Sequence, residues 1–311
     1  MIISKITHVG FHENKETTIL YFFLLTVAVL IRIFSNCLAN VYQKKLTIQG
    51  CNPISINAIT YFLLAIVSIV LVILFGFGEV TRGFWMYAAL VGLLGALGNG
   101  FLIKSLEKGE LSVLGPINAY KAVVGLIFGM LFLKEMPNLI GIVGMVLIIA
   151  GSYFVLDTLE ERFSWALLKN KQIQYRFYAL FFSAVEAVFI KKLILMSSIL
   201  DAFIVWCIFG AVFALLMVKI NKLSFVQEFN VLKTRNAAKF FNIVVCIGMM
   251  QYTTNYVFSK MDVAYALSLF QLCALVSVFL GYKFFMEKNI TKKLLGSAIM
   301  ITGAVLIILF N

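Results

Sequence analysis

The stretch LKEMPNLIGIVGMVLIIAG, residues 133–151, recurs in outline 152 residues later as FMEKNITKKLLGSAIMITG, residues 285–303. Each copy places a glutamate, Glu135 or Glu287, in a short turn between two long apolar segments. Each then carries two glycines in the second apolar segment. These are Gly144 and Gly151 in the first copy, and Gly296 and Gly303 in the second. A pattern repeated at a fixed spacing indicates that the chain folds as two related halves.

The composition of the chain places it in a membrane. Of its 311 residues, 62% are hydrophobic and 13% are charged, whereas a soluble domain is usually about half apolar and about a quarter charged. A net charge of +12 would suggest a nucleic-acid partner in a soluble protein. Here most lysines and arginines fall in short loops, where they orient helices and contact anionic lipid headgroups. The sequence therefore predicts an integral membrane protein with no nucleic-acid partner.

Residue types that support catalysis or metal binding are sparse. The two histidines, His8 and His12, lie in the N-terminal tail, and none of the five cysteines forms a CxxC pair. The apolar segments therefore lack imidazole, the usual metal ligand and general base. No nucleophile–base constellation and no phosphate-binding GxxxxGK(S/T) loop is apparent. We predict that the chain is not an enzyme and holds no metal and no cofactor.

Ten segments are apolar enough to cross a bilayer as helices, each of which needs about 20 residues. They span residues 18–42, 54–75, 83–103, 111–132, 139–156, 176–195, 199–218, 238–258, 263–284 and 294–310. The longest connections are 157–175 and 219–237, and the first of them separates five segments from five. We therefore predict an all-α fold with an N-terminal tail (1–17), a first five-helix repeat (18–156), a linker (157–175) and a second five-helix repeat (176–311).

The shift of 152 residues aligns the third, fourth and fifth segments with the eighth, ninth and tenth. Asn99 then falls on Gln251, and Glu110 falls on Asp262. Because each repeat has an odd number of helices, the two repeats cross the membrane in opposite directions. Such inverted repeats are typical of secondary transporters, whose substrate site is a central cavity between the halves.

Basic residues predict how the helices are oriented in the membrane. They concentrate on the side that holds the connections 43–53, 104–110 and 219–237, and few lie on the side of both termini. Because loops rich in lysine and arginine stay in the cytoplasm, this distribution predicts that both termini face outward.

Two five-helix repeats, each with a glutamate-bearing turn and a glycine-spaced last helix, resemble the drug/metabolite transporter superfamily, and within it the EamA-type transporters. The resemblance covers about residues 19–310. Two departures concern the turns, where Lys134 and Met286 replace the family's glycine, and the prolines of the fourth and ninth segments. Pro116 lies too early, the ninth segment has no proline, and Lys121 falls near the family's proline position.

The resemblance implies secondary transport of small metabolites or drugs, often export, by a multi-pass protein of the cell (inner) membrane. It also implies that both termini lie in the cytoplasm, which contradicts the orientation predicted from the basic residues.

Three charged residues lie deep within apolar segments, namely Arg32, Lys121 and Glu186. A charge in mid-membrane costs roughly 2.5–3.5 kcal/mol on insertion scales, and such residues usually face a cavity or a partner. They are candidates for a substrate or proton site, unless Glu186 pairs with Arg32 or Lys121 only to hold the bundle together. Two cations against one acid favour an anionic or zwitterionic metabolite. Alternatively, Glu186 exchanges a proton for a cationic drug.

Polar uncharged residues extend this candidate site. In lipid their side chains should point inward, where they either line the cavity or form hydrogen bonds between helices. The candidates are Asn36, Asn40, Asn57, Tyr61, Asn99, Asn118, Gln251, Asn255 and Gln271. Glu135 and Glu287, each just before the last helix of its repeat, are predicted to stabilise the turn through the helix dipole, with gating as the alternative role.

Together these features predict an alternating-access secondary transporter that exports a small organic metabolite with proton coupling. The alternatives are a cationic multidrug/proton antiporter, a lipid-carrier flippase and a membrane assembly protein without transport. The predicted partners are a small-molecule substrate, the lipid bilayer and protons, and the protein is predicted to be a monomer or homodimer.

Overall fold

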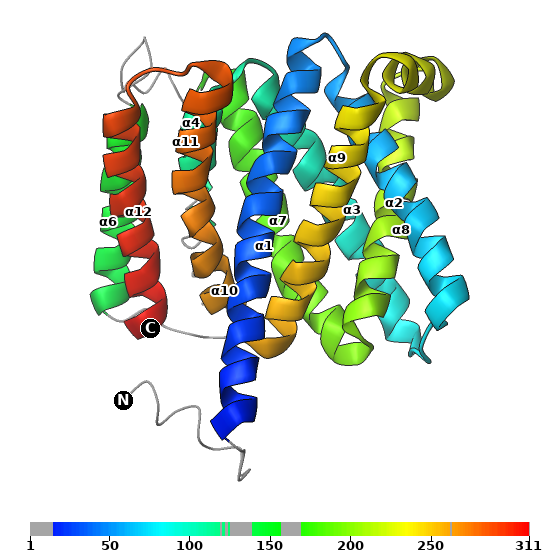
Figure 1. Cartoon of the computed structure of the whole chain (residues 1–311), viewed down its shortest axis with the longest axis horizontal. Helices are drawn as coiled ribbons and strands as arrows, with labels where there is room; N and C mark the ends of the chain where they lie inside the picture. The colour runs from blue at the N-terminus through cyan, green and yellow to red at the C-terminus, as the bar shows by residue number, and fades with distance from the viewer. Residues whose placement is uncertain are drawn as a thin grey trace.

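Long helices make up the regular structure of the chain (Figure 1). The computed structural model describes residues 15–118, 120–121, 124, 139–156, 169–261 and 263–310. The helices are α1 (Lys15–Ile48), α2 (Pro53–Phe75), α3 (Arg82–Lys108), α4 (Leu111–Ile117), α6 (Leu139–Leu156), α7 (Lys171–Met196), α8 (Ile199–Ile220), α9 (Phe225–Lys260), α10 (Val263–Leu269), the 3₁₀ turn η3 (Phe270–Leu272), α11 (Cys273–Phe285) and α12 (Ile290–Phe310). Within the described residues there is no strand.

Four of the described helices are long and apolar enough to cross a membrane. They are the Leu20–Ile48 part of α1, together with α2, α3 and α8. Large apolar side chains, such as Ile73 and Leu74, are exposed on the outside of the bundle. Contiguous apolar surface of this kind is unfavourable in water and fits contact with lipid.

Helix ends are set by short local signals. The side chain of Asn52 accepts a hydrogen bond from the backbone N–H of Ile54, and Pro53 occupies the first position of α2. This combination satisfies an N–H that lacks an intrahelical partner and suits the fixed φ of proline. Asn170 and Ser198 cap α7 and α8 in the same way. At the other end of α2, Gly76 has φ of 78°, a backbone conformation that favours glycine.

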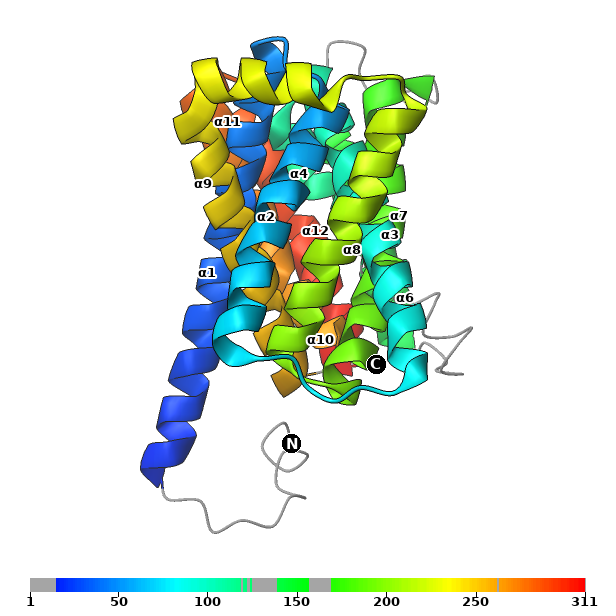
Figure 2. The same ribbon diagram turned by 90° about the vertical axis from the view of Figure 1, so that its right-hand side faces the viewer.

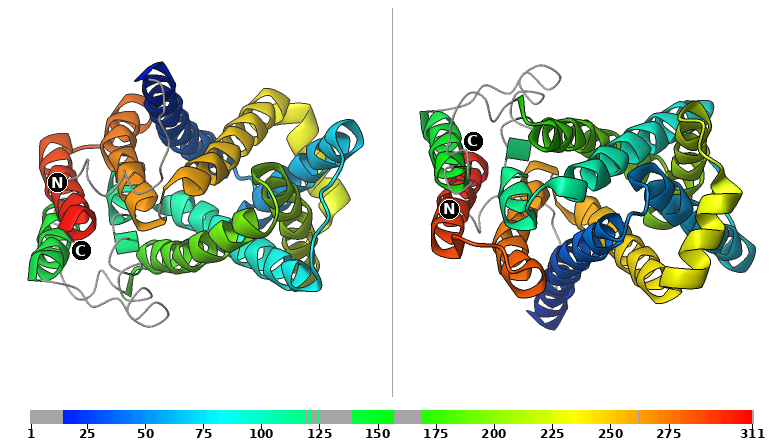
Figure 3. Two further views of the ribbon diagram at one scale, coloured as in Figure 1. Left: turned by 90° about the horizontal axis from the view of Figure 1, so that it is seen from below. Right: turned by 90° about the horizontal axis from the view of Figure 1, so that it is seen from above.

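The principal helix contacts join the part of the chain before residue 157 to the part after residue 169. α1 packs against α9, α2 against α8, α3 against both α7 and α8, α4 against α11, and α6 against α12. The last pair stands at one end of the bundle when it is viewed along the helices (Figure 3). The two parts of the chain therefore interlock and do not form separate lobes.

The repeated glycines lie where α6 and α12 approach each other most closely. A Cβ on Gly151 would lie 2.7 Å from the carbonyl oxygen of Gly296, and a Cβ on Gly303 would lie 2.5 Å from that of Gly144. The pairing of 144 with 303 and of 151 with 296 means that the two helices run antiparallel. Glycine is needed at these positions because the backbones are in direct contact.

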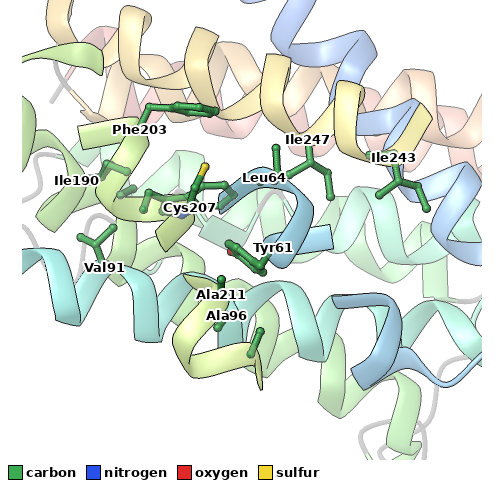
Figure 4. Packing of buried hydrophobic residues seen from close by; sticks show 14 of the residues in the cluster. Tyr61, Leu64, Val91, Ala96, Ile190, Phe203, Cys207, Ala211, Ile243 and Ile247 are labelled. Atoms are coloured by element: carbon green, nitrogen blue, oxygen red, sulfur yellow. The ribbon is translucent and has the colours of Figure 1, made fainter. Parts of the chain in front are cut away.

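A second close contact joins α2 to α8. The ring of Tyr61 lies against the α-carbon side of Gly210, where a Cβ would clash with it. Figure 4 shows Tyr61 beside Ala96 and Ala211, within a cluster of buried apolar residues. Small residues on α3 and α8 thus let one large ring fill the space between three helices.

Several predicted boundaries are wrong. The connection 219–237, predicted as a loop, is mostly helical, because α9 begins at Phe225. Figure 2 shows this first part of α9 lying across the top of the bundle. Phe225 and Phe229 pack against Phe62, with ring centroids 5.4 and 6.5 Å apart. The polar residues between them suggested a loop, whereas they form the solvent side of an amphipathic helix.

Other boundaries moved less. α7 begins at Lys171, five residues before the predicted start, and the predicted ninth segment is divided into α10, η3 and α11. Residues 125–138, which include Glu135, and Asp262 lie outside the described residues. The structure also joins Cys37 of α1 to Cys273 of α11 by a disulfide, with Cα atoms 6.3 Å apart, a pairing that the sequence did not indicate.

Candidate functional site

A cavity of about 120 Å³ lies at the centre of the bundle, between helices from both parts of the chain. Its walls come from α1, α2, α3, α7, α8 and α9, from residues just after α4, and from α10 and η3. Nine of the predicted site residues line it: Arg32, Asn36, Asn40, Tyr61, Asn99, Asn118, Lys121, Glu186 and Gln251.

Helical periodicity explains why these residues meet. On α1, Arg32, Asn36 and Asn40 follow one another at intervals of four and share one face. On α7, Ala179, Ser183, Glu186 and Ile190 occupy one stripe, at intervals of three and four. The cavity is therefore lined by the less apolar face of helices whose other faces are in contact with lipid or with neighbouring helices.

The guanidinium of Arg32 is buried, and two of its three nitrogen atoms lack hydrogen-bond partners among the described residues. The side chain is 6% exposed, and its Nε and Nη1 atoms have no hydrogen bond within the structure. Its central carbon lies 4.1 Å from the centre of the Phe270 ring, a cation–π contact. Because an unpaired buried donor costs about 1–3 kcal/mol, the N–H groups of these two nitrogen atoms are suited to a ligand or water in the cavity.

Lys121 and Glu186 line the same cavity without pairing. In the described part of the chain, Glu186 has no ion pair within 4.0 Å, so the predicted pairs with Arg32 and Lys121 are not formed. The Lys121 ammonium nonetheless lies within electrostatic range of Arg32, Arg176 and Glu186. These four charges form one cluster in which, among the described residues, no cation forms an ion pair with a carboxylate of its own.

Arg176 is a cavity residue that the sequence reasoning missed. It is 6% exposed, and its Nε donates a hydrogen bond to the carbonyl oxygen of Leu114 at 2.8 Å. The predicted sixth segment, 176–195, places Arg176 at a helix end, where a cation is expected at the membrane surface. The signal was present, since Arg176 lies three residues before Ala179 and seven before Ser183, and so continues the stripe of α7 that lines the cavity.

Glu186 is held by an aromatic pair. Its Oε1 accepts a hydrogen bond from Trp206 Nε1 at 2.5 Å, and the indole packs on Tyr61 with ring centroids 4.8 Å apart. The hydroxyl of Tyr61 is buried with no hydrogen-bond partner. A Cβ on Gly95 would lie 2.8–2.9 Å from Trp206 Nε1, Glu186 Oε1 and the Tyr61 hydroxyl. Glycine at residue 95 therefore makes room for this arrangement.

Three of the predicted site residues have side-chain amides that lie outside the cavity and form hydrogen bonds within the helix bundle. Asn57 donates to the carbonyl oxygen of Ala96 at 2.9 Å and accepts from Asn99 at 2.7 Å. The side chain of Asn255 is hydrogen-bonded to that of Gln251 at 3.0 Å. Gln271 donates to the carbonyl oxygen of Leu267 at 2.9 Å, one turn earlier in the chain. These bonds hold the cavity wall and leave Asn99 and Gln251 at its surface.

Glu287 lies away from the cavity, at the N-terminus of α4. Its carboxylate accepts hydrogen bonds from Lys44 Nζ at 2.7 Å and from the backbone N–H groups of Leu111 and Ser112, both at 2.8 Å. Burial by itself raises the pKa of Glu287. The Lys44 ammonium and the donors from Ser112 outweigh this effect and hold the pKa below its ordinary value of 4.5. The glutamate therefore fastens the turn after α11 to α1 and α4.

A neighbouring ion pair strengthens the same face. Lys293 of α12 pairs with Glu110 and donates to the hydroxyl of Ser112 at 2.8 Å. The N-terminus of α4 thus lies between two lysine–glutamate pairs. The equivalent glutamate of the first repeat, Glu135, lies outside the described residues. No group of three or more His, Cys, Asp or Glu that could hold a metal ion occurs within the described ranges.

Comparison with known proteins finds a matching family model and similar solved structures. Residues 18–157 match the model of the EamA-like transporter family. A solved structure entitled "Crystal structure of protein" is similar over 92% of this chain and 96% of that chain, with a TM-score of 0.64 and 13% sequence identity. At that identity the likeness concerns the fold alone. No curated protein matches the sequence.

Proposed function

Because residues 18–157 match the EamA-like transporter family, we propose that this chain is a multi-pass membrane transporter of small molecules and that its central cavity takes an anionic or zwitterionic organic metabolite. The observation that carries the proposal is the set of charges in the cavity. Arg32, Lys121 and Arg176 line it as cations, and Glu186 is the single carboxylate among the described lining residues.

The charge imbalance distinguishes between substrate classes. A buried charge without a partner is unfavourable, so an anion that enters the cavity gains the interactions that the cations lack in the empty protein. A cationic drug would meet three like charges and one carboxylate that already accepts a hydrogen bond from Trp206. The site therefore favours a metabolite with a carboxylate or phosphate over a cationic drug.

The proposed architecture is a pair of inverted five-helix repeats that move about the cavity. Three observations support it. The repeated glycines pack against each other across α6 and α12, and these two helices run antiparallel. In addition, α1 and α3 of the first repeat correspond to α7 and α9 of the second. The contact of α1 with α9 is therefore the repeat-related equivalent of the contact of α7 with α3. In such folds the halves move relative to each other about a site near mid-membrane.

Glu186 is the proposed coupling residue. It can gain and lose a proton within the cavity, where its charge acts directly on Lys121. Protonation would remove the one negative charge and make the cavity more favourable for an anion, so proton and anion would bind together. We propose that the direction of physiological transport is export, as the family resemblance implies. Because the proton leaves together with the anion, the outward gradient of the substrate drives this export.

Transport by reconstituted protein tests the proposal. The purified chain in liposomes would be given a pH gradient and a panel of amino acids, organic acids, sugar phosphates and cationic dyes, beside Glu186→Gln. We expect gradient-driven uptake of an acid or zwitterion by the wild type, and loss of that uptake in Glu186→Gln. Uptake of cationic dyes alone would favour the antiporter. No uptake by a folded protein would favour a lipid substrate or a role without transport.

A further inference from the structure

The disulfide between Cys37 and Cys273 joins two stretches of the chain that both line the central cavity. Cys37 of α1 directly follows Asn36, and Cys273, the first residue of α11, lies three residues after Phe270. Asn36 and Phe270 belong to the cavity wall, and α1 stands beside α11 in the bundle (Figure 1). The covalent link therefore lies in the wall of the proposed transport site.

Both sulfur atoms are buried directly behind this wall. Cys37 is 0% exposed and Cys273 is 6% exposed. The side-chain amide of Asn36 donates to the Cys273 sulfur at 3.2 Å, and the hydroxyl of Ser277 lies 3.7 Å from each of the two sulfur atoms. Because Asn36 also lines the cavity, its side chain connects the cavity with the disulfide.

The link also keeps Arg32 close to Phe270. Arg32 lies five residues before Cys37, and its guanidinium carbon is 4.1 Å from the centre of the Phe270 ring. The Cα atoms of the two cysteines are 6.3 Å apart, and a disulfide usually holds them within about 4.4–6.8 Å. While the bond is intact, α1 cannot move away from the start of α11.

The repeat places a different kind of pair at the equivalent position in the first half of the chain. The bounds of α4 and α10 differ by the same shift of 152 residues, which also places Lys121 at the equivalent of Cys273. Since α7 corresponds to α1, the contact of α1 with Cys273 corresponds to an approach of α7 to Lys121. In the described structure Lys121 and Glu186 of α7 form no ion pair within 4.0 Å. One contact is closed by a covalent bond, and its equivalent is not closed.

From this relation we infer that Cys37 and Cys273 form a redox lock, in which the disulfide holds the transporter in the state seen here and the two thiols allow it to change state. The inference rests on the proposed function, in which two inverted repeats move relative to each other. When inverted repeats exchange their conformations, repeat-related contacts exchange as well. The contact of α1 with Cys273 must then open while α7 approaches Lys121, and the disulfide prevents the first of these movements.

Thiol–disulfide exchange with a dithiol releases the lock. A thiolate of the dithiol attacks one sulfur of the bond and forms a mixed disulfide, which the second thiol of the same molecule resolves. The dithiol supplies two electrons and two protons and closes to a cyclic disulfide, while Cys37 and Cys273 become thiols. A small-molecule disulfide restores the bond by the reverse exchange and is itself reduced to two thiols.

The test uses the full chain in lipid nanodiscs and needs no substrate. The wild type is prepared without reductant and with dithiothreitol, beside Cys37→Ser and Cys273→Ser, which cannot form the bond whether or not dithiothreitol reaches it. Cys246→Ser, which removes a free cysteine from α9, is the control. Alkylation of the denatured protein and mass spectrometry identify the free thiols. Without reductant, we expect Cys37 and Cys273 to be joined and Cys246 to be free.

Hydrogen–deuterium exchange then compares the linked and unlinked forms. If the disulfide were only a structural crosslink, its removal would loosen its own segments, residues 32–40 and 267–277. A lock of the transport cycle also changes α7, which no disulfide restrains. We expect Cys37→Ser and Cys273→Ser to exchange about tenfold faster in the two linked segments and several-fold more slowly at residues 179–190 of α7, which close toward Lys121. Cys246→Ser should exchange like the linked wild type.

Several outcomes would overturn the inference. Free thiols at Cys37 and Cys273 in the wild type prepared without reductant would mean that no lock forms. Unchanged exchange, or faster exchange confined to residues 32–40 and 267–277, would make the disulfide a structural crosslink. Equal effects of Cys246→Ser and Cys37→Ser would mean that the pair has no special role. None of these results bears on the proposed anion cargo, which the uptake of acids and dyes by liposomes tests separately.

Discussion

The carboxylate of Glu186 on α7 accepts a hydrogen bond from the indole nitrogen of Trp206 on α8 at 2.5 Å, in the wall of the central cavity. The two residues lie 20 positions apart in the chain and on consecutive helices, and the indole is held from its other side by Tyr61 of α2. The bond orients the carboxylate without neutralising it. This arrangement suits a group that must carry a proton in one step and a charge in the next.

The first prediction separates proton coupling from substrate binding at Glu186. In Glu186→Gln the side-chain amide oxygen can still accept the bond from Trp206, but the side chain can no longer exchange a proton. We expect the variant to lose accumulation driven by a pH gradient and to retain exchange of labelled for unlabelled substrate across liposomes. Counterflow and gradient-driven uptake, measured on the same vesicles, check this. Loss of both activities in a folded variant would mean that Glu186 binds substrate and does not only couple protons.

Trp206→Phe is the matching control for that pair. It keeps an aromatic ring beside Tyr61, and it removes the donor to Glu186 together with the second ring of the indole. Because a hydrogen bond to a charged group contributes about 1.5–3 kcal/mol, we expect about a tenfold lower rate of both exchange and driven uptake. A variant that transports at the wild-type rate would show that the bond does not position the carboxylate for its task.

The second prediction concerns the glycines that reveal the repeat. Gly151→Leu should destabilise the protein by about 1–3 kcal/mol, because its Cβ would lie 2.7 Å from the carbonyl oxygen of Gly296 and force α6 away from α12. Gly296→Leu should act similarly, since the contact is reciprocal. Thermal unfolding of the purified protein checks both variants.

A glycine outside such a contact provides the control. A Cβ on Gly83 would meet only the end of Met196 at 3.9 Å, and alanine favours the helix more than glycine does. Gly83→Ala should therefore unfold at the wild-type temperature or slightly above it. Equal destabilisation by Gly83→Ala and Gly151→Leu would show that the α6–α12 contact is not the cause.

The third prediction concerns the pH dependence contributed by Glu287. Its folded-state pKa lies below the ordinary value of 4.5, so its bonds to Lys44 and α4 contribute fully to stability above that value. The contribution is lost as the pH falls through the lower folded-state pKa, where the carboxylate takes up a proton. Glu287→Gln lacks this contribution at every pH. We expect the variant to be about 1–3 kcal/mol less stable near neutral pH, and the difference to shrink on acidification below 4.5.

Unfolding temperatures measured from about pH 7 to about pH 3 check this. Glu79→Gln is the control, because Glu79 is exposed in the connection between α2 and α3. Surface substitutions of this kind usually change stability by about 0.5 kcal/mol or less, so this variant should differ little from the wild type. A gap between wild type and Glu287→Gln that does not change with pH would contradict the role assigned to the carboxylate.

The sequence was sufficient for features that follow from local periodicity and composition. The membrane class, the bounds of α6, the resemblance confirmed by the family match over residues 18–157, and the placing of Arg32, Lys121 and Glu186 at one cavity all follow from apolar runs and the cost of burying charge. The repeat predicted glycines with a special role, and the structure places them at a backbone contact.

Other features depend on distant parts of the chain. Arg176 falls at the start of the predicted sixth segment, yet α7 begins at Lys171 and carries Arg176 into the cavity wall. The first part of α9 was taken for a loop because its apolar residues are few. It folds as a helix because Phe225 and Phe229 pack against Phe62 of α2. Nothing in the sequence indicates that Glu287 caps α4, which begins 176 residues earlier, because that contact arises only when the two parts of the chain interlock.

The last prediction decides the orientation in the membrane. In the structure both described ends of the chain, Lys15 and Phe310, lie on the face opposite the lysine-rich one (Figure 1). The cations at the lysine-rich face are Lys44, Lys45, Lys104, Lys108, Lys169, Lys171, Lys219, Lys222, Lys239, Lys283, Lys288, Lys292 and Lys293, against Arg82, Lys191, Lys192 and Lys260 near the other. Because basic loops remain in the cytoplasm, we expect both termini to be outside, contrary to the orientation implied by the resemblance.

Labelling of single introduced cysteines in intact cells with a membrane-impermeant thiol reagent tests this orientation. Glu79→Cys lies in the connection between α2 and α3, and Lys222→Cys in the turn between α8 and α9; both positions are exposed and lie on opposite faces. We expect Glu79→Cys to react from outside and Lys222→Cys to react only after the cells are permeabilised, with the parent chain giving the background from its native cysteines. The reverse pattern would place the termini in the cytoplasm. The lysine-rich face would then lie outside the cell, so the orientation would be set by the packing of the helices and not by the charge rule.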